Sequence, residues 1–328
     1  MVMLPQTLMR FWGIKLKRNT EFYQFEYLTR HKNDHIIKNS IYKLNTIMLN
    51  QIGFSFNSQI SLNKNYDFES KECTIDSHIL THKKHFPSLN NIKVFSVVPY
   101  ISIGHYTVSL IDIQNIKHFL RSLIRSFRLW QSYKPKSVWS WNYEFSKSKF
   151  RLTDFLWTNK EIDHSQIKKV STEFLKSNSA NFPELSCILE SDQILLILPP
   201  FDIEFQTFIQ MFKSKLQNSK IFAEKFLLFD KIFIKQHRIY LHEFPNTFEL
   251  FSKKFIVLNS PLSRVLPAEI ILLANQHISL LTCPTSAMFA RIDIPVYMLN
   301  DFNDFNDTDK REYGFMLKKA RRNGMEIL

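Results

Sequence analysis

Three polar stretches in the second half of the chain carry the residue types that phosphate recognition needs. They are Lys235-Gln236-His237-Arg238, Asn259-Ser260-Pro261 and Cys283-Pro284-Thr285-Ser286. Imidazole, ammonium and hydroxyl groups donate hydrogen bonds to phosphate oxygens. Where such hydroxyls open a helix, backbone N–H groups and the helix dipole add to them. The pattern indicates a phosphate site, and two plainer alternatives remain: an ordinary N-cap at Thr285-Ser286 and a surface histidine at position 237.

Each of these stretches follows a short apolar run that is a predicted strand. Such strands are expected at residues 194–198, 231–235, 255–258, 277–282 and 296–299, and helices at 203–216, at 266–275 and from Pro284 onward. Strands separated by about 20–30 residues of helix are typical of a parallel sheet with crossover helices. Ligands of such sheets bind outside the carboxyl ends of the strands, so the three polar stretches are expected at one edge.

The first half of the chain is less regular. Strands are predicted at 93–98, 107–111 and 137–141, and the clearest helix at 114–131. That helix has apolar side chains at helical spacing, which predicts a buried stripe, opposite a basic face. The stripe consists of Ile116, Phe119, Leu120, Leu123, Ile124, Phe127 and Trp130. A polar segment near residues 177–185 suggests two domains, 1–185 and 186–328.

The second half resembles the nucleotide-binding domain of the bacterial GT-B sialyltransferases, the lipooligosaccharide sialyltransferase family and the related capsular polysialyltransferases. The resemblance covers roughly residues 190–300 and rests on three stretches in the same order: IFIKQHR (232–238), LPAEIILL (266–273) and HISLLTCPTSAMF (277–289). It implies an α/β fold with two Rossmann-type domains facing a cleft, the N-terminal one degenerate in part. It also implies an inverting transfer of sialic acid from CMP-sialic acid to a surface glycan.

The resemblance assigns the phosphate of CMP to His237, Thr285 and Ser286, with Lys235 beside them, and the nucleoside to Glu269. Two departures stand out: Arg238 replaces the family's Pro, and the acidic motif that carries the catalytic base is not intact. Glu144, after the 137–141 strand, is the first candidate for that base and Asp154 the second. An inverting transfer needs a carboxylate to accept the acceptor proton, and donors to stabilise the leaving phosphate. It needs no metal or other cofactor, since the CMP-sugar is a substrate.

The composition limits which fold classes and functions the chain can have. The chain has 328 residues, 45% of them apolar, which suits two domains with sizeable cores and excludes a disordered chain. Its 5 glycines allow neither a GxGxxG nor a Walker phosphate loop. Three scattered cysteines favour a reducing compartment. His78, His82 and His85 near Cys73 have spacing that zinc accepts, but the segment is lysine-rich and weakly patterned, so no metal site is predicted.

The net charge of +13 has two possible explanations. An AT-rich genome favours lysine codons, which would enrich lysine on a solvated surface; alternatively, the protein binds an anionic partner. The basic, aromatic N-terminus and the basic helix face make an anionic membrane surface a candidate partner. No segment reaches the ~18 apolar residues of a membrane span, so a cytoplasmic, peripheral inner-membrane location is expected. No nucleic-acid-binding signature is present. The alternatives to a sialyltransferase are a GT-B transferase with another nucleotide sugar and a non-catalytic protein that binds a glycan or a partner.

Overall fold

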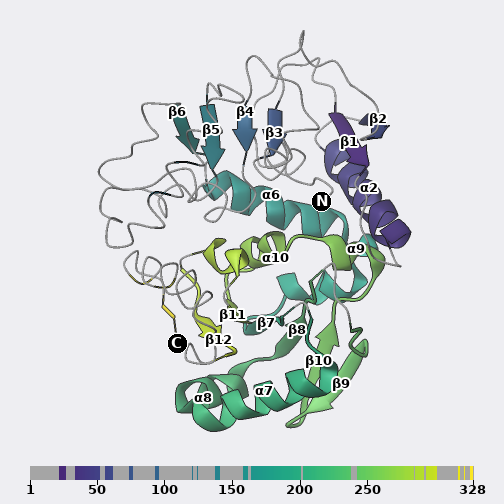
Figure 1. Cartoon of the computed structure of the whole chain (residues 1–328). Helices are drawn as coiled ribbons and strands as arrows, with labels where there is room; N and C mark the ends of the chain where they lie inside the picture. Colours follow the sequence, from purple (N-terminus) through teal and green to yellow (C-terminus); the bar gives the residue numbers. More distant parts are fainter. Residues whose placement is uncertain are drawn as a thin grey trace. The chain divides into compact units, whose positions relative to one another are not determined.

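The computed structural model describes twelve stretches of the chain. These are residues 22–26, 34–51, 56–61, 74–76, 93–95, 137–140, 158–161, 164–200, 202–237, 242–283, 285–291 and 293–300, with the positions 120, 124, 317, 321, 326 and 327. The chain divides into two compact units, Met1–Val170 and Ser171–Leu328, so the division falls before the predicted boundary at residue 185. Figure 1 gives the element labels.

The first unit contains parallel strands and helices. Strands β1 (Phe22–Glu26) and β2 (Phe56–Ser61) pair in parallel. A second sheet has the order β3-β4-β5-β6, built from Thr74–Asp76, Lys93–Phe95, Ser137–Ser140 and Thr158–Glu161, all parallel. Helix α2 spans Asp34–Gln51, and α6 (His164–Ser177) runs across the division into the second unit. The predicted strands at 93 and 137 are present, and the one at 107–111 lies outside the described residues.

Two positions of the predicted helix 114–131 are described, and they correct the sequence reading. Leu120 and Ile124 are helical, as expected, but their side chains are 47% and 50% exposed. The expectation that both belong to a buried stripe is wrong. Apolar spacing shows which residues share a helix face, and it does not show that another element covers that face.

The second unit is built on a six-stranded mixed sheet of order β12-β11-β7-β8-β10-β9. Its strands are β7 (Ile194–Leu198), β8 (Lys231–Ile234), β9 (Thr247–Leu250), β10 (Lys253–Val257), β11 (Ile278–Thr282) and β12 (Val296–Met298). All are parallel except β9, which pairs antiparallel with β10. The predicted sheet is therefore confirmed for five strands, and β9 was missed.

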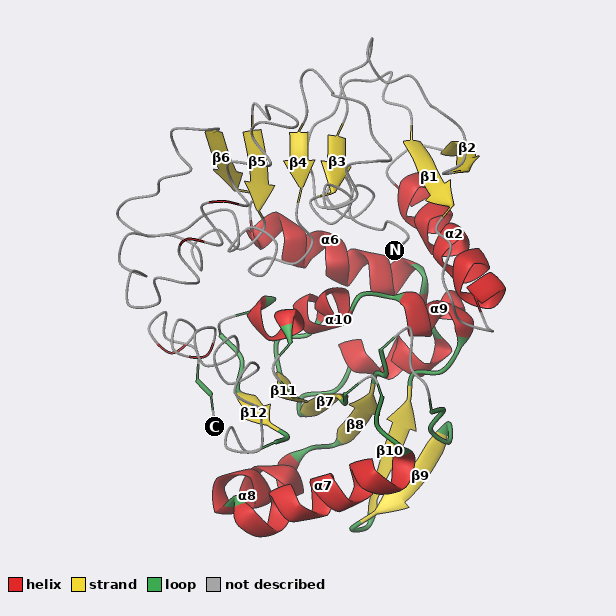
Figure 2. Ribbon diagram, viewed as in Figure 1, coloured by secondary structure: helices red, strands yellow, loops and turns green. Residues whose placement is uncertain are grey.

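Helices cover both faces of this sheet. Helices α7 (Phe205–Asn218) and α8 (Lys220–Leu228) lie over one face, and α9 (Pro261–Val265) and α10 (Ala268–Ala274) over the other, as Figures 1 and 2 show. Three 3₁₀ helices complete the described part of the unit: η5 (Ser179–Asn181), η6 (Pro183–Leu189) and η7 (Ser286–Phe289). Strands covered on both sides read as continuous apolar runs, and all residues of β11 are buried. The unit is thus an α/β fold of the doubly wound kind.

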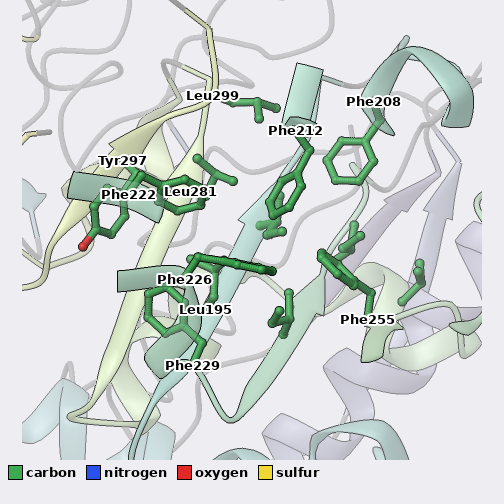
Figure 3. Packing of buried hydrophobic residues seen from close by; sticks show 14 of the residues in the cluster. Leu195, Phe208, Phe212, Phe222, Phe226, Phe229, Phe255, Leu281, Tyr297 and Leu299 are labelled. Atoms are coloured by element: carbon green, nitrogen blue, oxygen red, sulfur yellow. The ribbon is translucent and has the colours of Figure 1, made fainter. Parts of the chain in front are cut away.

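Phenylalanine fills the layer between the sheet and the helices α7 and α8 (Figure 3). Phe212 on α7 has four aromatic neighbours, with ring centroids at 6.1 Å from Phe208, 6.0 Å from Phe222, 5.5 Å from Phe226 and 5.3 Å from Phe255. The last three contacts join α7 to α8 and to the strand β10, which lies beside the edge strand β9. Edge-on ring pairs add to the burial of area, so this cluster holds the helix pair on the sheet.

Candidate functional site

The topology singles out the carboxyl edge of the sheet between β7 and β11. From β7 the chain proceeds to β8 on one side, while β11 pairs with β7 on the other side. This reversal is a topological switch point, where sheets of this kind leave a crevice for a ligand. The hydroxyl oxygen of Thr282 lies 3.2 Å from the carbonyl oxygen of Leu198, which ties the two strand ends together. The residues that follow both strands are therefore the candidate site.

Thr285 stands at the start of η7, directly after β11. It occupies the N-cap position of this four-residue 3₁₀ helix, with φ −143° and ψ 158°, but its side chain makes no capping hydrogen bond. The plain N-cap alternative therefore does not account for the hydroxyl. Since η7 is a single short turn, it offers backbone N–H groups but little of a helix dipole. Ser286 is the first residue of that turn.

His237 follows β8, on the other side of β7 from Thr285. Its side chain is exposed, and the structure describes the chain only as far as this residue before resuming at His242. Two strand spacings separate β8 from β11, which is about 10 Å. His237 and Thr285 thus belong to one sheet edge and are not on adjacent strands.

Lys235 and Gln236 have structural partners. Lys235 is buried, and its ammonium donates to the carbonyl oxygen of Arg264 at 2.8 Å. Gln236 donates to the carbonyl of His242 at 2.8 Å and accepts from the backbone N–H of Phe244 at 3.1 Å. These bonds fix the end of β8 against α9 and against the returning chain. Lys235 was predicted to bind nucleotide, and at least one of its protons serves the fold instead.

The helix start after β10 is closed by a carboxylate. Glu184 of η6 accepts hydrogen bonds from the N–H and the hydroxyl of Ser260 and from the hydroxyl of Ser263, each at 2.9 Å. Because α9 intervenes between β10 and α10, Glu269 opens the second helix after this strand, where it is half-buried. The sequence analysis did not predict α9. It therefore also did not predict that the carboxylate of Glu184 occupies the start of the helix nearest to β10.

Two further side chains at the switch point were not predicted, Asp202 after β7 and Asn300 after β12. The thiol of Cys283 donates to Asn300 Oδ1 at 3.0 Å. Burial, and to a smaller extent the charge of the exposed Asp202, raise the pKa of Cys283 from 9.0 to about 12. The thiol therefore stays protonated at neutral pH. No spacing motif marks Asp202 or Asn300, because the strands that bring them together are far apart in the sequence.

A buried arginine holds the segment that carries Thr285. Arg291 is 3% exposed and donates to the carbonyl oxygens of Leu272, at 3.2 Å, and Asn275, at the C-terminal end of α10. It also forms a two-fold ion pair with Asp293. These bonds fasten the chain just beyond η7 to α10, and so restrict where Thr285 can lie.

The remaining candidates fall outside the described residues: Glu144, Asp154 and the run of His78, His82, His85 and Cys73. Among the side chains that the structure describes, no group of three or more His, Cys, Asp or Glu is arranged to hold a metal ion. No helix in the described part of the chain combines the length and the apolar character needed to cross a membrane. No protein-family model matches the sequence, and no curated protein matches it significantly.

Proposed function

We propose that the chain is an inverting glycosyltransferase of GT-B architecture that transfers sialic acid from CMP-sialic acid to a cell-surface glycan, lipooligosaccharide or capsule. One observation carries the proposal: the side chain of Thr285, which makes no capping bond, stands at the switch point of a doubly wound sheet. That point is where sheets of this kind bind nucleotides. The resemblance of residues 190–300 to sialyltransferases adds the identity of the nucleotide.

In this proposal the departing phosphate of CMP lies between Thr285, Ser286 and His237. Hydroxyl, backbone N–H and imidazole donors stabilise the charge that develops on the phosphate as the glycosidic bond breaks. Glu269 takes the ribose hydroxyls. Lys235 places the strand end through its bond to Arg264 and adds a positive charge behind the site. No metal is needed, because the leaving group is a single phosphate with these donors around it.

The other half of the reaction is a proton transfer. The acceptor hydroxyl attacks the anomeric carbon and gives its proton to a carboxylate, for which Glu144 is the first candidate and Asp154 the second. In a GT-B arrangement that carboxylate belongs to the first domain and faces the nucleotide across a cleft. The proposed place of action is the cytoplasmic face of a bacterial inner membrane, where nucleotide sugars and lipid-linked acceptors meet.

A non-catalytic protein that binds a glycan or a partner is the second candidate, and one observation favours it. The helix start after β10 is filled by Glu184, and Lys235 donates to a backbone carbonyl. The α9 helix start and the Lys235 ammonium could both bind a phosphate at this edge, but each already has a hydrogen-bond partner within the protein. A GT-B transferase with another nucleotide sugar has no observation of its own in its favour.

The binding of CMP to substituted chains tests the proposal. His237→Ala and Thr285→Val should each weaken CMP binding by about 10- to 100-fold, the range for one hydrogen bond to a charged group. His277→Ala is the matched control, because His277 is also exposed but lies just before β11, at the opposite edge of the sheet. Titration calorimetry measures the three dissociation constants. Equal CMP affinity in His237→Ala, Thr285→Val and His277→Ala would refute the proposed phosphate site.

A further inference from the structure

Three large apolar side chains are exposed where the end of α8 meets the turn between β9 and β10. Leu227, Leu228 and Phe251 are 71%, 54% and 54% exposed, and we call them the apolar tip. Lys253 joins the two elements by donating to the carbonyls of Leu227, at 2.9 Å, and of Phe229, at 2.8 Å. The rings of Phe226 and Phe251 also meet, with centroids 6.4 Å apart. The tip is therefore one local surface.

The turn makes the exposure of Phe251 unusual. Phe251 and Ser252 both have positive φ, 52° and 58°, and they join two antiparallel strands as a two-residue turn. Asn, Asp and Gly are the residues that adopt this turn readily, whereas a bulky side chain is strained there. An aromatic ring at this position loses backbone stability and recovers only part of it by burial. Its large exposed fraction favours a use outside the fold.

Exposed lysines lie on the elements that form the tip and on the strand that follows α8. They are Lys225 on α8, Lys231 at the start of β8 and Lys254 on β10, while Lys220 lies at the opposite end of α8 from Leu228. The neighbouring carboxylates are those of Glu224, Asp230 and Glu249, and Glu224 lies 3.9 Å from Lys220 as an ion pair. With Lys253 included, positive groups outnumber negative ones here, as they do in the chain as a whole, which carries +13. A partner that complements this surface has an apolar region to contact the tip and negative charges around that region to pair with the lysines.

We propose that the apolar tip inserts into the interface of an anionic phospholipid bilayer, with the flanking ammonium groups among the head groups. Leucine and phenylalanine enter the boundary of the acyl chains, while lysines extend their charged ends to the phosphates. Each lysine near an anionic surface adds to the attraction. The inference agrees with the membrane location in the proposed function but does not use the nucleotide site, because the tip lies at the amino edge of the sheet: Phe251 precedes β10, and α8 precedes β8. The candidate phosphate site lies at the carboxyl edge.

Vesicle binding by the full chain tests the inference. Wild type should bind vesicles of phosphatidylcholine mixed with phosphatidylglycerol, and bind pure phosphatidylcholine much more weakly. The triple variant Leu227→Gln, Leu228→Gln, Phe251→Asn should lower the partition constant on the mixed vesicles about tenfold or more. Glutamine suits an exposed helix position and asparagine suits the turn, so the fold is kept. Ile36→Gln is the control, since Ile36 is an apolar residue 41% exposed on α2.

Three outcomes overturn the inference. The first is equal binding of the mixed vesicles by wild type and the triple variant. The second is equal binding of both vesicle types by wild type. The third is a wild-type dimer in light scattering that the triple variant loses, without vesicle binding by either, because the tip would then join two copies of the chain. CMP binding, measured in parallel, is expected to be unchanged, so failure here and failure of the proposed function are separate results.

Discussion

Replacing Arg291 with methionine should destabilise the second unit and loosen the segment that carries Thr285 and Ser286. The guanidinium of Arg291 is 3% exposed and supplies donors to the carbonyls of Leu272 and Asn275. Methionine fills a similar volume but donates nothing. Two carbonyl oxygens at the end of α10 then lose their partners in a buried place.

The magnitude follows from those two groups. Leaving one buried polar group unsatisfied costs about 1–3 kcal/mol, so two cost about 2–6 kcal/mol. Removing one partner of a buried ion pair costs about 3–5 kcal/mol. Asp293 is 60% exposed, so the carboxylate left behind is solvated and adds little. We therefore expect the free energy of unfolding to fall by about 2–6 kcal/mol, with CMP affinity falling as Thr285 loses its fixed position.

Hydrogen exchange followed by mass spectrometry measures this effect within the second unit. Peptides from α10 and β11 should exchange about 30- to 10⁴-fold faster in Arg291→Met, from the expected loss of free energy. Asp293→Asn is the control and should change exchange by less than about tenfold, since an exposed partner contributes about 1 kcal/mol or less. All 5 tryptophans precede residue 158, so their fluorescence reports the first unit and serves as a second control. Equal exchange in Arg291→Met and wild type would refute the role of Arg291.

Four further outcomes are expected. Phe212→Ala should lower the free energy of unfolding by about 3–5 kcal/mol in urea titrations followed by circular dichroism, because it empties the centre of the aromatic cluster; a loss below about 1 kcal/mol would contradict that packing. Since the pKa of Cys283 is about 12 in the folded state and 9.0 ordinarily, stability should fall as pH rises between these values, and Cys283→Ser should flatten that slope. Alkylation of Cys283 at pH 8 should accelerate in Asp202→Asn, since removal of the negative charge lowers the pKa. Glu144→Gln should cut sialyl transfer about 10²- to 10⁴-fold with CMP affinity unchanged, and an active Glu144→Gln would move the role of base to Asp154.

The strands of the second unit could be predicted because they are buried on both faces. Residues 194–198 are a continuous apolar run, and residues 278–282 are mostly apolar with Ser279 and Thr282 among them; β7 and β11 coincide with the two predicted strands almost residue for residue. The strand β9 could not be predicted, since Thr247–Leu250 is short and half-exposed, and its turn is Phe-Ser where a hairpin normally has Asn or Gly. Helix α9 was missed for a similar reason: five residues show no period.

The candidate site was predictable only where its residues follow strands. His237, Thr285 and Ser286 could be assigned to one sheet edge because the ends of parallel strands share an edge, whereas the order of the strands at that edge could not be predicted; their role as phosphate ligands stays a prediction. Glu184 shows the limit most clearly. It meets Ser260 across 76 positions of sequence, and nothing near either residue signals the contact. The same holds for Arg291, whose partners are carbonyl oxygens, because backbone acceptors leave no trace in the sequence.

The melting temperature of the full chain with CMP, UDP and GDP tests the central claim most directly. A ligand at about 100 times its dissociation constant stabilises the folded state by about 2.7 kcal/mol, which raises the melting temperature of a domain of this size by about 5–10 °C. The account predicts that rise with CMP, a smaller one with UDP or GDP, and none with CMP in the double variant His237→Ala, Thr285→Val. A chain whose melting temperature is unmoved by saturating CMP, or moved equally by all three nucleotides, would contradict it.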